Sequence, residues 1–234
     1  MSRVDGVRIR GLQRRFGGVV AVDGVDLDVP AGAVTALIGP NGAGKTSLFH
    51  CVTGMDTADA GTVTLGDREL SGLPSHVRAR AGIAWTYQRI ELFAGLTVAE
   101  NVYLGVQPIN RLGAVDWTAM AKGARQQLSK LGLDLDPKVT LGELPIGIQQ
   151  LVELSRVLFS GASIIILDEP TSALSPPEID RLFRSLRKLK EEGNSLIFIS
   201  HFLEDVLSIA DEITVFRNGR KVVNAAVTPE IDKA

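Results

Sequence analysis

The chain has a single cysteine and no long apolar run, and these two gaps exclude several classes of protein. One cysteine, Cys51, excludes an internal disulfide and is typical of a chain that folds in a reducing compartment. No apolar run reaches the roughly 20 residues of a transmembrane helix, and the first residues, MSRVD, lack the apolar segment of a signal peptide. We therefore expect a cytosolic chain.

An excess of charge of one sign is also absent. The formal net charge is -2, so no global basic field argues for a nucleic-acid partner or an anionic lipid surface. We expect no nucleic acid among the partners. The 234 residues are 45% hydrophobic, which is enough for one sizeable core and typical of an α/β domain.

Short apolar runs alternate with helical patterns along most of the chain. Apolar and branched residues predict strands at 7–12, 25–29, 33–38, 61–66, 82–87, 163–167, 195–199 and 213–216, the last of these being the final strand. Apolar residues spaced three and four apart predict helices from Lys45 and over 98–104, 117–131, 149–158 and 177–192. The stretch from 97 to 158 contains only helical patterns, so we predict an all-helical insertion in an α/β core.

The most informative segment directly follows the predicted strand at 33–38. Residues 39–46 read GPNGAGKT and match the phosphate-binding pattern G-x-x-x-x-G-K-[ST]. Glycines let such a loop fold tightly around a polyphosphate, and Lys45 and the following helix N-terminus add positive charge. Thr46 would offer its hydroxyl to Mg²⁺. An ordinary Gly-rich turn needs neither the lysine nor the threonine at fixed positions.

Two carboxylates, Asp168 and Glu169, end the predicted strand at 163–167. Open α/β sheets bind their ligands at this end of the strands. Asp168 is placed to hold Mg²⁺, directly or through water, and Glu169 to orient or deprotonate a water that attacks a γ-phosphate. The alternative, a solvated acidic turn, fits poorly with the branched apolar residues that precede the pair.

His201 ends the next predicted strand. A histidine there could hydrogen-bond a γ-phosphate oxygen and the attacking water. Taken alone, such a histidine could equally be a satisfied structural residue. The ordered set of Lys45, Gln88, the acidic pair and His201 favours the functional interpretation.

These residues resemble the nucleotide-binding subunit of an ATP-binding cassette (ABC) transporter over nearly the whole chain. The resemblance rests on the phosphate loop GPNGAGKTS, the glutamine Gln88, the run SIIILDEPTSAL and the histidine in ISH. It implies an α/β P-loop NTPase fold, with a RecA-like core of mostly parallel sheet, an antiparallel β subdomain and an inserted helical subdomain. Residues 1–234 would form one ABC ATPase domain, with the core and β subdomain at 1–88 and 159–234 and the helical subdomain at about 89–158.

The resemblance also implies how single residues bind ATP. Phe16 would stack on adenine, although a phenylalanine before Gly17 could equally be a core residue at a strand end. Lys45 and the loop amides would bind the β- and γ-phosphates, and Ser47 would approach the α-phosphate. The expected nucleotide-binding residues of the loop are Gly39, Pro40, Asn41, Gly42, Ala43, Gly44, Lys45, Thr46 and Ser47.

The same resemblance implies the roles of the remaining polar residues. Thr46 and Gln88 would join Asp168 as ligands of Mg²⁺. Glu169 would be the catalytic base, and His201 would be the second catalytic residue. The implied reaction is hydrolysis of ATP to ADP and phosphate, coupled to transport across a membrane.

One family motif departs from its usual form. The motif Leu-Ser-Gly-Gly-Gln, which contacts ATP bound to the opposite subunit, is replaced here by a segment we call the signature segment: Leu144, Pro145, Ile146, Gly147, Ile148 and Gln149. Proline lacks both an N–H and a hydroxyl, and Ile146 adds a branched side chain where phosphate must approach the backbone. Each charge-assisted hydrogen bond contributes about 1.5–3 kcal/mol, so losing one or two would weaken ATP engagement by about one to three orders of magnitude. Ser175 replaces an aspartate that often follows the nearby SAL.

The altered segment leaves several arrangements open. This chain could pair with a different cassette that has a regular signature, or two copies could pair and turn over slowly. A purely regulatory cassette is a third arrangement, against which the presence of Glu169 and His201 argues.

The two halves of the chain resemble different importers. The first half, with RRFGGVVAVDGV and QRIELF, resembles the branched-chain amino acid importer ATPases. The second half, with LPIGIQQLVELSRVL and FRNGR, resembles one cassette of the monosaccharide importers. Because the region that meets the membrane subunits lies at about 89–105, we favour branched-chain amino acids as cargo, with monosaccharides as the alternative.

The family resemblance also implies partners and a location. The partners would be transmembrane permease subunits, a second ABC ATPase subunit and, indirectly, an extracytoplasmic solute-binding protein. The chain would be peripheral, at the cytoplasmic face of the inner membrane. ABC-type ATPases of translation and DNA repair usually carry two cassettes or a long coiled-coil insertion, and this sequence contains neither.

Overall fold

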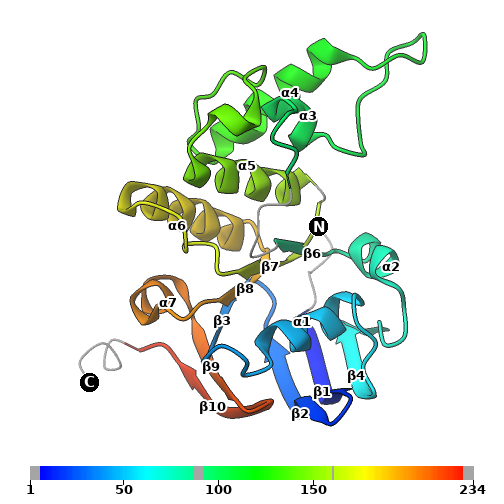
Figure 1. Ribbon diagram of the computed structural model, residues 1–234, viewed down its shortest axis with the longest axis vertical. Helices are drawn as coiled ribbons and strands as arrows, with labels where there is room; N and C mark the ends of the chain where they lie inside the picture. Colours follow the sequence, from blue (N-terminus) through cyan, green and yellow to red (C-terminus); the bar gives the residue numbers. More distant parts are fainter. Residues whose placement is uncertain (1–5, 87–91, 160, 229–234) are drawn as a thin grey trace. The chain divides into compact units, whose positions relative to one another are not determined.

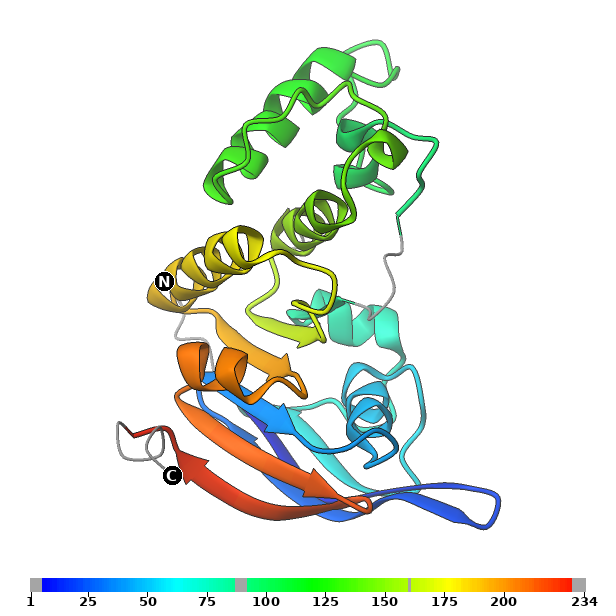
Figure 2. The same ribbon diagram turned by 60° about the vertical axis from the view of Figure 1, so that its left-hand side comes forward.

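The computed structural model describes residues 6–86, 92–159 and 161–228, and the chain divides into two compact units (Figures 1 and 2). Unit 1 comprises Met1–Trp85, Ala162–Glu169 and Leu186–Ala234. Unit 2 comprises Thr86–Gly161 and Pro170–Ser185. The stretch Pro170–Ser185 thus groups with the helical segment, whereas the sequence-based division assigned it to the core.

Unit 1 is built around a six-stranded sheet in the order β10-β9-β3-β8-β7-β6. Its central strands run parallel, and β9 and β10 pair antiparallel. All five residues of β7 and of β8 are buried, which is why these strands read as continuous apolar runs. The strands are β3 (Val34–Ile38), β6 (Ile83–Thr86), β7 (Ile164–Asp168), β8 (Ser195–Ile199), β9 (Glu212–Arg217) and β10 (Arg220–Ala226).

A second, antiparallel sheet has the order β2-β1-β4-β5. Its two longest strands form a hairpin that turns at Gly17 and Gly18, so both extend further than their apolar alternation predicted. The reason is that like residues follow one another near the tip, as in Arg14-Arg15 and Val19-Val20, which breaks the period of two expected for a strand. The strands are β1 (Val7–Phe16), β2 (Val19–Val29), β4 (Ala60–Leu65) and β5 (Arg68–Glu69).

Helix α1 (Lys45–Thr53) shares one hydrophobic core with both sheets. Its buried Leu48, Phe49 and Val52 belong to the same cluster as Ile9 of the antiparallel sheet and Ile166 of the six-stranded sheet. Two short helices of unit 1, α2 (Ser75–Arg80) and α7 (Leu203–Ile209), were not predicted because each has few buried apolar residues.

The predicted last strand, 213–216, is followed by another, so the prediction that it ended the sheet was wrong. Asn218 and Gly219 both have positive φ, 51° and 75°, and this turn leads the chain back along β9 as β10. Strand β10 is mostly exposed and rich in polar residues, and such a sequence shows no apolar alternation.

Unit 2 contains α3 (Val98–Val102), α4 (Trp117–Lys130), the short 3₁₀ helix η1 (Leu141–Glu143), α5 (Ile146–Phe159) and the first part of α6 (Pro176–Glu191). Helix α3 begins with a capping box, in which the Thr97 amide donates to Glu100 and the Glu100 amide donates to Thr97. Across the described ranges, no helix has the length and hydropathy needed to cross a bilayer.

Candidate active site

The phosphate-binding loop runs from the end of β3 into α1, as its pattern predicts. Gly44 has a φ of 101°, and a Cβ at this position would overlap the backbone carbonyl oxygen of Ala21. Only glycine combines this φ with this close approach. The carbonyl of Ala43 accepts a hydrogen bond of 2.8 Å from the Gly219 amide, which ties the loop to the β9–β10 turn.

The loop presents backbone donors at the start of α1. Within the described ranges, the amides of residues 44–47 donate to no other group, as expected for the first turn of a helix. Aligned peptide dipoles place partial positive charge at the same end. Thr46 is exposed and Ser47 half-buried, so both hydroxyls remain accessible. These features suit the binding of an anion.

Lys45 is buried beside this loop. Its Nζ donates to the Gly39 carbonyl at 2.6 Å and to the Pro40 carbonyl at 3.1 Å, and the residue is 7% exposed. Burial lowers the pKa of Lys45, and the charges of Glu169 and Asp168 oppose that shift. The ammonium group is therefore held by the loop backbone, close to two carboxylates.

Asp168 and Glu169 lie where β7 ends, and both are 6% exposed. Glu169 has a φ of 50°, an uncommon value for a residue with a side chain, and its amide donates to the Ile199 carbonyl at 2.9 Å. This turn explains how two adjacent side chains reach the same site. Burial, reinforced by Glu169 and opposed by Lys45, raises the pKa of Asp168 to about 6.

His201 follows β8, the neighbour of β7 in the sheet, and contacts Glu169 of the acidic pair. Its Nδ1 lies 2.9 Å from Oε2 of Glu169. The Glu169 side chain is 7% exposed, whereas the His201 side chain is 51% exposed. The histidine thus reaches from solvent to a buried carboxylate, which is the geometry of a pair that handles a proton at a surface site.

The oxygen-rich groups of this site fit a Mg²⁺ ion. Asp168 is 6% exposed and is the last residue of β7, at the site. Mg²⁺ prefers carboxylate, hydroxyl and phosphate oxygens, so this carboxylate is a suitable ligand. Asp168 and the accessible Thr46 hydroxyl supply such oxygens, whereas the third expected ligand, Gln88, lies outside the described residues.

Phe16 stands at the end of β1 and is 44% exposed, so it is not the core residue that the sequence left as an alternative. The guanidinium carbon of Arg14 lies 4.5 Å from the centre of the Phe16 ring. No sequence signal indicated this contact.

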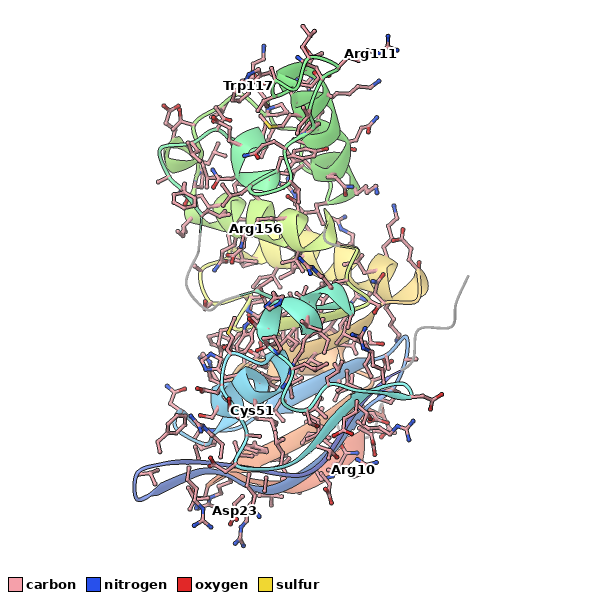
Figure 3. All side chains as sticks on the ribbon, turned by 90° about the vertical axis from the view of Figure 1, so that its right-hand side faces the viewer. Arg10, Asp23, Cys51, Arg111, Trp117 and Arg156 are labelled. Atoms are coloured by element: carbon pink, nitrogen blue, oxygen red, sulfur yellow. The ribbon has the colours of Figure 1, made fainter. Side chains whose placement is uncertain are left out.

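Cys51 lies in the same unit (Figure 3) and is buried. Burial raises the pKa of its thiol to about 11, so Cys51 acts as a packing residue of the core.

The signature segment lies in unit 2, where it leads into α5. Pro145 and Ile146 are exposed, while Gly147 is buried. Gln149 closes the segment, because its Nε2 donates to the Leu144 carbonyl at 2.8 Å and its amide donates to the Pro145 carbonyl at 3.1 Å. Helix α5 begins three residues before the predicted helix at 149–158, since Gly147 is a poor helix former and its presence argued against a helical first turn.

A carboxylate that the sequence analysis did not single out lies against Gly147. A Cβ on Gly147 would come within 2.5 Å of both carboxylate oxygens of Glu178. Glu178 Oε2 also accepts hydrogen bonds from the Ser175 amide at 2.8 Å and the Ser175 hydroxyl at 2.6 Å, and these bonds lower the pKa of Glu178. The pattern S-x-x-E before a helix was the available signal.

Several known proteins are similar to this chain in sequence. A sequence profile of the family described as ABC transporter matches residues 22–172. Ribose import ATP-binding protein RbsA 1 of Rubrobacter xylanophilus is 43% identical over 216 residues, which are 92% of this chain and 43% of that protein. Ribose import ATP-binding protein RbsA 2 of Streptomyces coelicolor is 41% identical over 225 residues, or 96% of this chain and 43% of that protein.

Solved structures agree with the fold. A nucleotide-free ATP-binding cassette from an ABC transporter superposes with a TM-score of 0.86 at 28% identity, covering 98% of this chain and 94% of its own. The predicted P-loop NTPase fold is confirmed. The present chain spans 43% of the length of the two ribose import proteins. These relatives favour the monosaccharide alternative and give no support to the branched-chain amino acid prediction.

Proposed function

Because the chain belongs to the ABC transporter family, we propose that it binds and hydrolyses ATP as the nucleotide-binding part of a monosaccharide importer. The observation that carries this proposal is the cluster of Lys45, Asp168 and Glu169, all buried beside the phosphate-binding loop, with His201 at 2.9 Å from Glu169.

Binding of the triphosphate would use the loop from Gly39 to Ser47. The free amides at the start of α1 would donate to phosphate oxygens, and Lys45 would exchange its two loop carbonyls for the β- and γ-phosphates. Phe16, at the end of β1, would receive the adenine ring. Mg²⁺, when bound by Asp168 and Thr46 and by Gln88 as predicted, would neutralise part of the phosphate charge.

Hydrolysis would depend on Glu169 and His201. Glu169 would accept a hydrogen bond from the attacking water and orient it in line with the γ-phosphate, and it would accept the proton as the P–O bond to water forms. His201 fixes the Glu169 carboxylate at 2.9 Å and would donate from its exposed ring to the γ-phosphate oxygens. The bond from the γ-phosphorus to the bridging oxygen breaks, and ADP leaves with that oxygen.

Coupling to transport would require a second cassette. In this arrangement ATP would be sandwiched between two cassettes, closed by the signature segment of the opposite one, and hydrolysis would release that closure. Pro145 and Ile146 weaken this contact, so we propose either a partner cassette with a regular signature or a slow pair of identical chains. Permease subunits and a solute-binding protein complete the proposed importer, with this chain on the cytoplasmic face of the membrane.

The monosaccharide proposal replaces branched-chain amino acids as the favoured cargo. It is supported by relatives that are named ribose import ATP-binding proteins and that match 92% and 96% of this chain. To test this proposal, the chain would be reconstituted in vesicles with its permease and binding protein, and the rate of ATP hydrolysis would be measured with different solutes added. We expect pentoses or hexoses to stimulate turnover, and stimulation by leucine or isoleucine instead would contradict the proposal.

Replacing Glu169 with glutamine tests the hydrolytic mechanism. Loss of the base should lower the rate of phosphate release by about 10²- to 10⁴-fold while ATP binding persists, so that an ATP-bound dimer accumulates. Glu69→Gln, an exposed carboxylate on β5, is the matched control and should change neither property. Unchanged turnover in Glu169→Gln would show that Glu169 is not the base.

A further inference from the structure

Arg14 and Phe16 are two residues apart at the end of β1, and their side chains contact each other. The Arg14 guanidinium carbon lies 4.5 Å from the centre of the Phe16 ring, which is within cation–π range. Phe16 itself remains 44% exposed. The strand therefore ends in an aromatic ring that is contacted by a cation and still open to a ligand.

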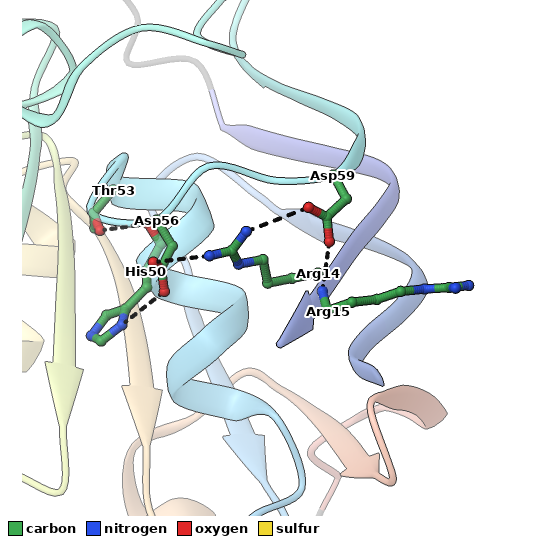
Figure 4. A network of polar contacts seen from close by, with 6 residues as sticks. All are labelled: Arg14, Arg15, His50, Thr53, Asp56 and Asp59. Carbon is green, nitrogen blue, oxygen red and sulfur yellow. Dashed lines mark hydrogen bonds and ion pairs between the residues drawn. The ribbon is translucent and has the colours of Figure 1, made fainter. Parts of the chain in front are cut away.

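Two aspartates hold the Arg14 guanidinium in this position (Figure 4). Its Nη2 lies 3.4 Å from Asp56 and its Nη1 lies 3.4 Å from Asp59, and the Arg14 side chain is only 20% exposed. The Arg14 Nε is buried and has no hydrogen-bond partner among the described residues. A guanidinium that is so largely removed from water and lies between two carboxylates has little freedom to move.

The aspartates are themselves anchored to backbone and ring groups. Asp59 accepts a hydrogen bond of 2.6 Å from the Arg15 amide, and its own amide donates to the Gln13 carbonyl at 2.8 Å. Asp56 lies 3.6 Å from the Nδ1 of His50, on helix α1 (Figure 4). The Arg14 guanidinium is thus tied both to its own strand and to the helix that follows the phosphate-binding loop.

We propose that Arg14 is a positioning residue that holds the Phe16 ring in place to receive the adenine base of ATP. This inference rests on the proposed function, in which Phe16 stacks on adenine. A ring fixed before binding loses less rotamer freedom when the base arrives, so Arg14 contributes to affinity without touching the nucleotide. Because Asp56 and Asp59 neutralise its charge, Arg14 is poorly suited to bind phosphate itself.

The test separates binding of the base from binding of the phosphates. We would measure, by calorimetry, the affinities of Arg14→Gln for a non-hydrolysable MgATP analogue and for magnesium tripolyphosphate, which has no base. The analogue should bind about three- to tenfold more weakly, with tripolyphosphate unchanged. The matched control is Arg10→Gln, on the same strand as Arg14 (Arg10 is labelled in Figure 3). This change breaks an exposed ion pair of 2.6 Å with Asp28 of β2 and should alter neither affinity.

A double-mutant cycle makes the inference sharper. Phe16→Ala should weaken analogue binding, and adding Arg14→Gln to Phe16→Ala should have no further effect, because the ring to be positioned is gone. Equal losses of analogue and tripolyphosphate affinity in Arg14→Gln would overturn the inference, as would a full effect of Arg14→Gln in the absence of the ring. Unchanged analogue affinity in Arg14→Gln would overturn it too.

Failure of the proposed function would look different, since the wild-type chain would then bind neither the analogue nor tripolyphosphate.

If Arg14→Gln does not fold, Asp59→Asn serves in its place, because it removes one anchor of the guanidinium and keeps the cation. We expect Asp59→Asn to lower analogue affinity about two- to threefold, again with tripolyphosphate unchanged, and an equal loss for both ligands would contradict the inference.

Discussion

The phosphate-binding loop of unit 1 and the signature segment of unit 2 each retain a glycine, but for different physical reasons. At Gly44, a Cβ would overlap the backbone carbonyl of Ala21. At Gly147, a Cβ would meet the end of the Glu178 side chain. Backbone cannot move aside without disturbing a strand, whereas a flexible side chain can. The loop is therefore fixed by the fold, and the signature segment can adjust.

The two regions also differ in how they hold charge. The loop has Lys45, Asp168 and Glu169 beside it, all at most 7% exposed. The signature segment has the half-buried Glu178 as its charged neighbour, ionised and facing the first turn of α5. A carboxylate there adds negative charge where a phosphate of the opposite subunit is proposed to approach, which sharpens the contrast between a strong site and a weakened one.

The largest expected effect comes from repairing the signature segment. Pro145→Ser combined with Ile146→Gly restores a hydroxyl, an amide donor and close access to the backbone. In the Glu169→Gln background, the ATP concentration that produces half of the dimer should fall by about 10- to 1000-fold, as measured by sedimentation. Leu112→Ser, at a side chain that is 93% exposed in the same unit, should leave it unchanged. Equal dimerisation with and without the repair would show that the altered segment is not impaired.

The buried charge beside the loop predicts an effect of pH on stability. Because the pKa of Asp168 is raised from 3.8 to about 6, the folded state holds that proton more tightly than the unfolded state. The contribution of Asp168 to the wild-type free energy of unfolding should therefore fall as pH rises from about 4 to 6. Asp168→Asn removes this cost, so above pH 6 the variant should be more stable by about 1–3 kcal/mol.

Urea unfolding at pH 4 and at pH 8 measures this difference. The gain of Asp168→Asn should be present at pH 8 and nearly absent at pH 4, even though the variant would lose a proposed Mg²⁺ ligand. A gain of the same size at both values would contradict the assigned cause.

Alanine substitution at the loop glycine tests the backbone constraint. In Gly44→Ala the alanine is strained at a φ of 101°, and its Cβ overlaps the Ala21 carbonyl oxygen. We therefore expect a loss of about 1–3 kcal/mol in the free energy of unfolding, together with loss of nucleotide binding. Gly95→Ala is the control, because Gly95 has no positive φ and no atom near an added Cβ. If Gly44→Ala unfolded at the same midpoint urea concentration as the wild-type chain, the backbone constraint would be refuted.

The smallest effect is expected at Gly147. Here an added methyl group displaces a carboxylate that can rotate away, so Gly147→Ala should cost less than about 1 kcal/mol of unfolding free energy. Glu178→Ala in the same chain should remove that cost, which urea unfolding of the single and double variants would reveal as non-additivity. Full additivity would mean that the two residues do not interact.

The sequence predicted those parts of the molecule whose structure is decided locally. Strands β7 and β8 read as buried because every residue except Asp168 and Ser195 is apolar, and the glycines of the loop pattern determine the backbone of the phosphate-binding loop. Strand β10 and helices α2 and α7 escaped prediction, since each is short or exposed and shows no apolar period.

The missed features of the candidate site share another cause. The contact of Arg14 with Phe16 depends on Asp56 and Asp59, and the contact of Gly147 depends on Glu178. In both cases the partners are far apart along the chain, and only the fold brings them together. The capping pattern from Ser175 to Glu178 was visible in the sequence, but its meeting with α5 was not.

A crystal structure of the chain with Mg²⁺ and a non-hydrolysable ATP analogue tests the central claim most directly. We predict the terminal phosphate within hydrogen-bond reach of Lys45, the metal beside Asp168, and the adenine ring against Phe16. An empty loop, or a terminal phosphate far from Asp168 and Glu169, would contradict the account.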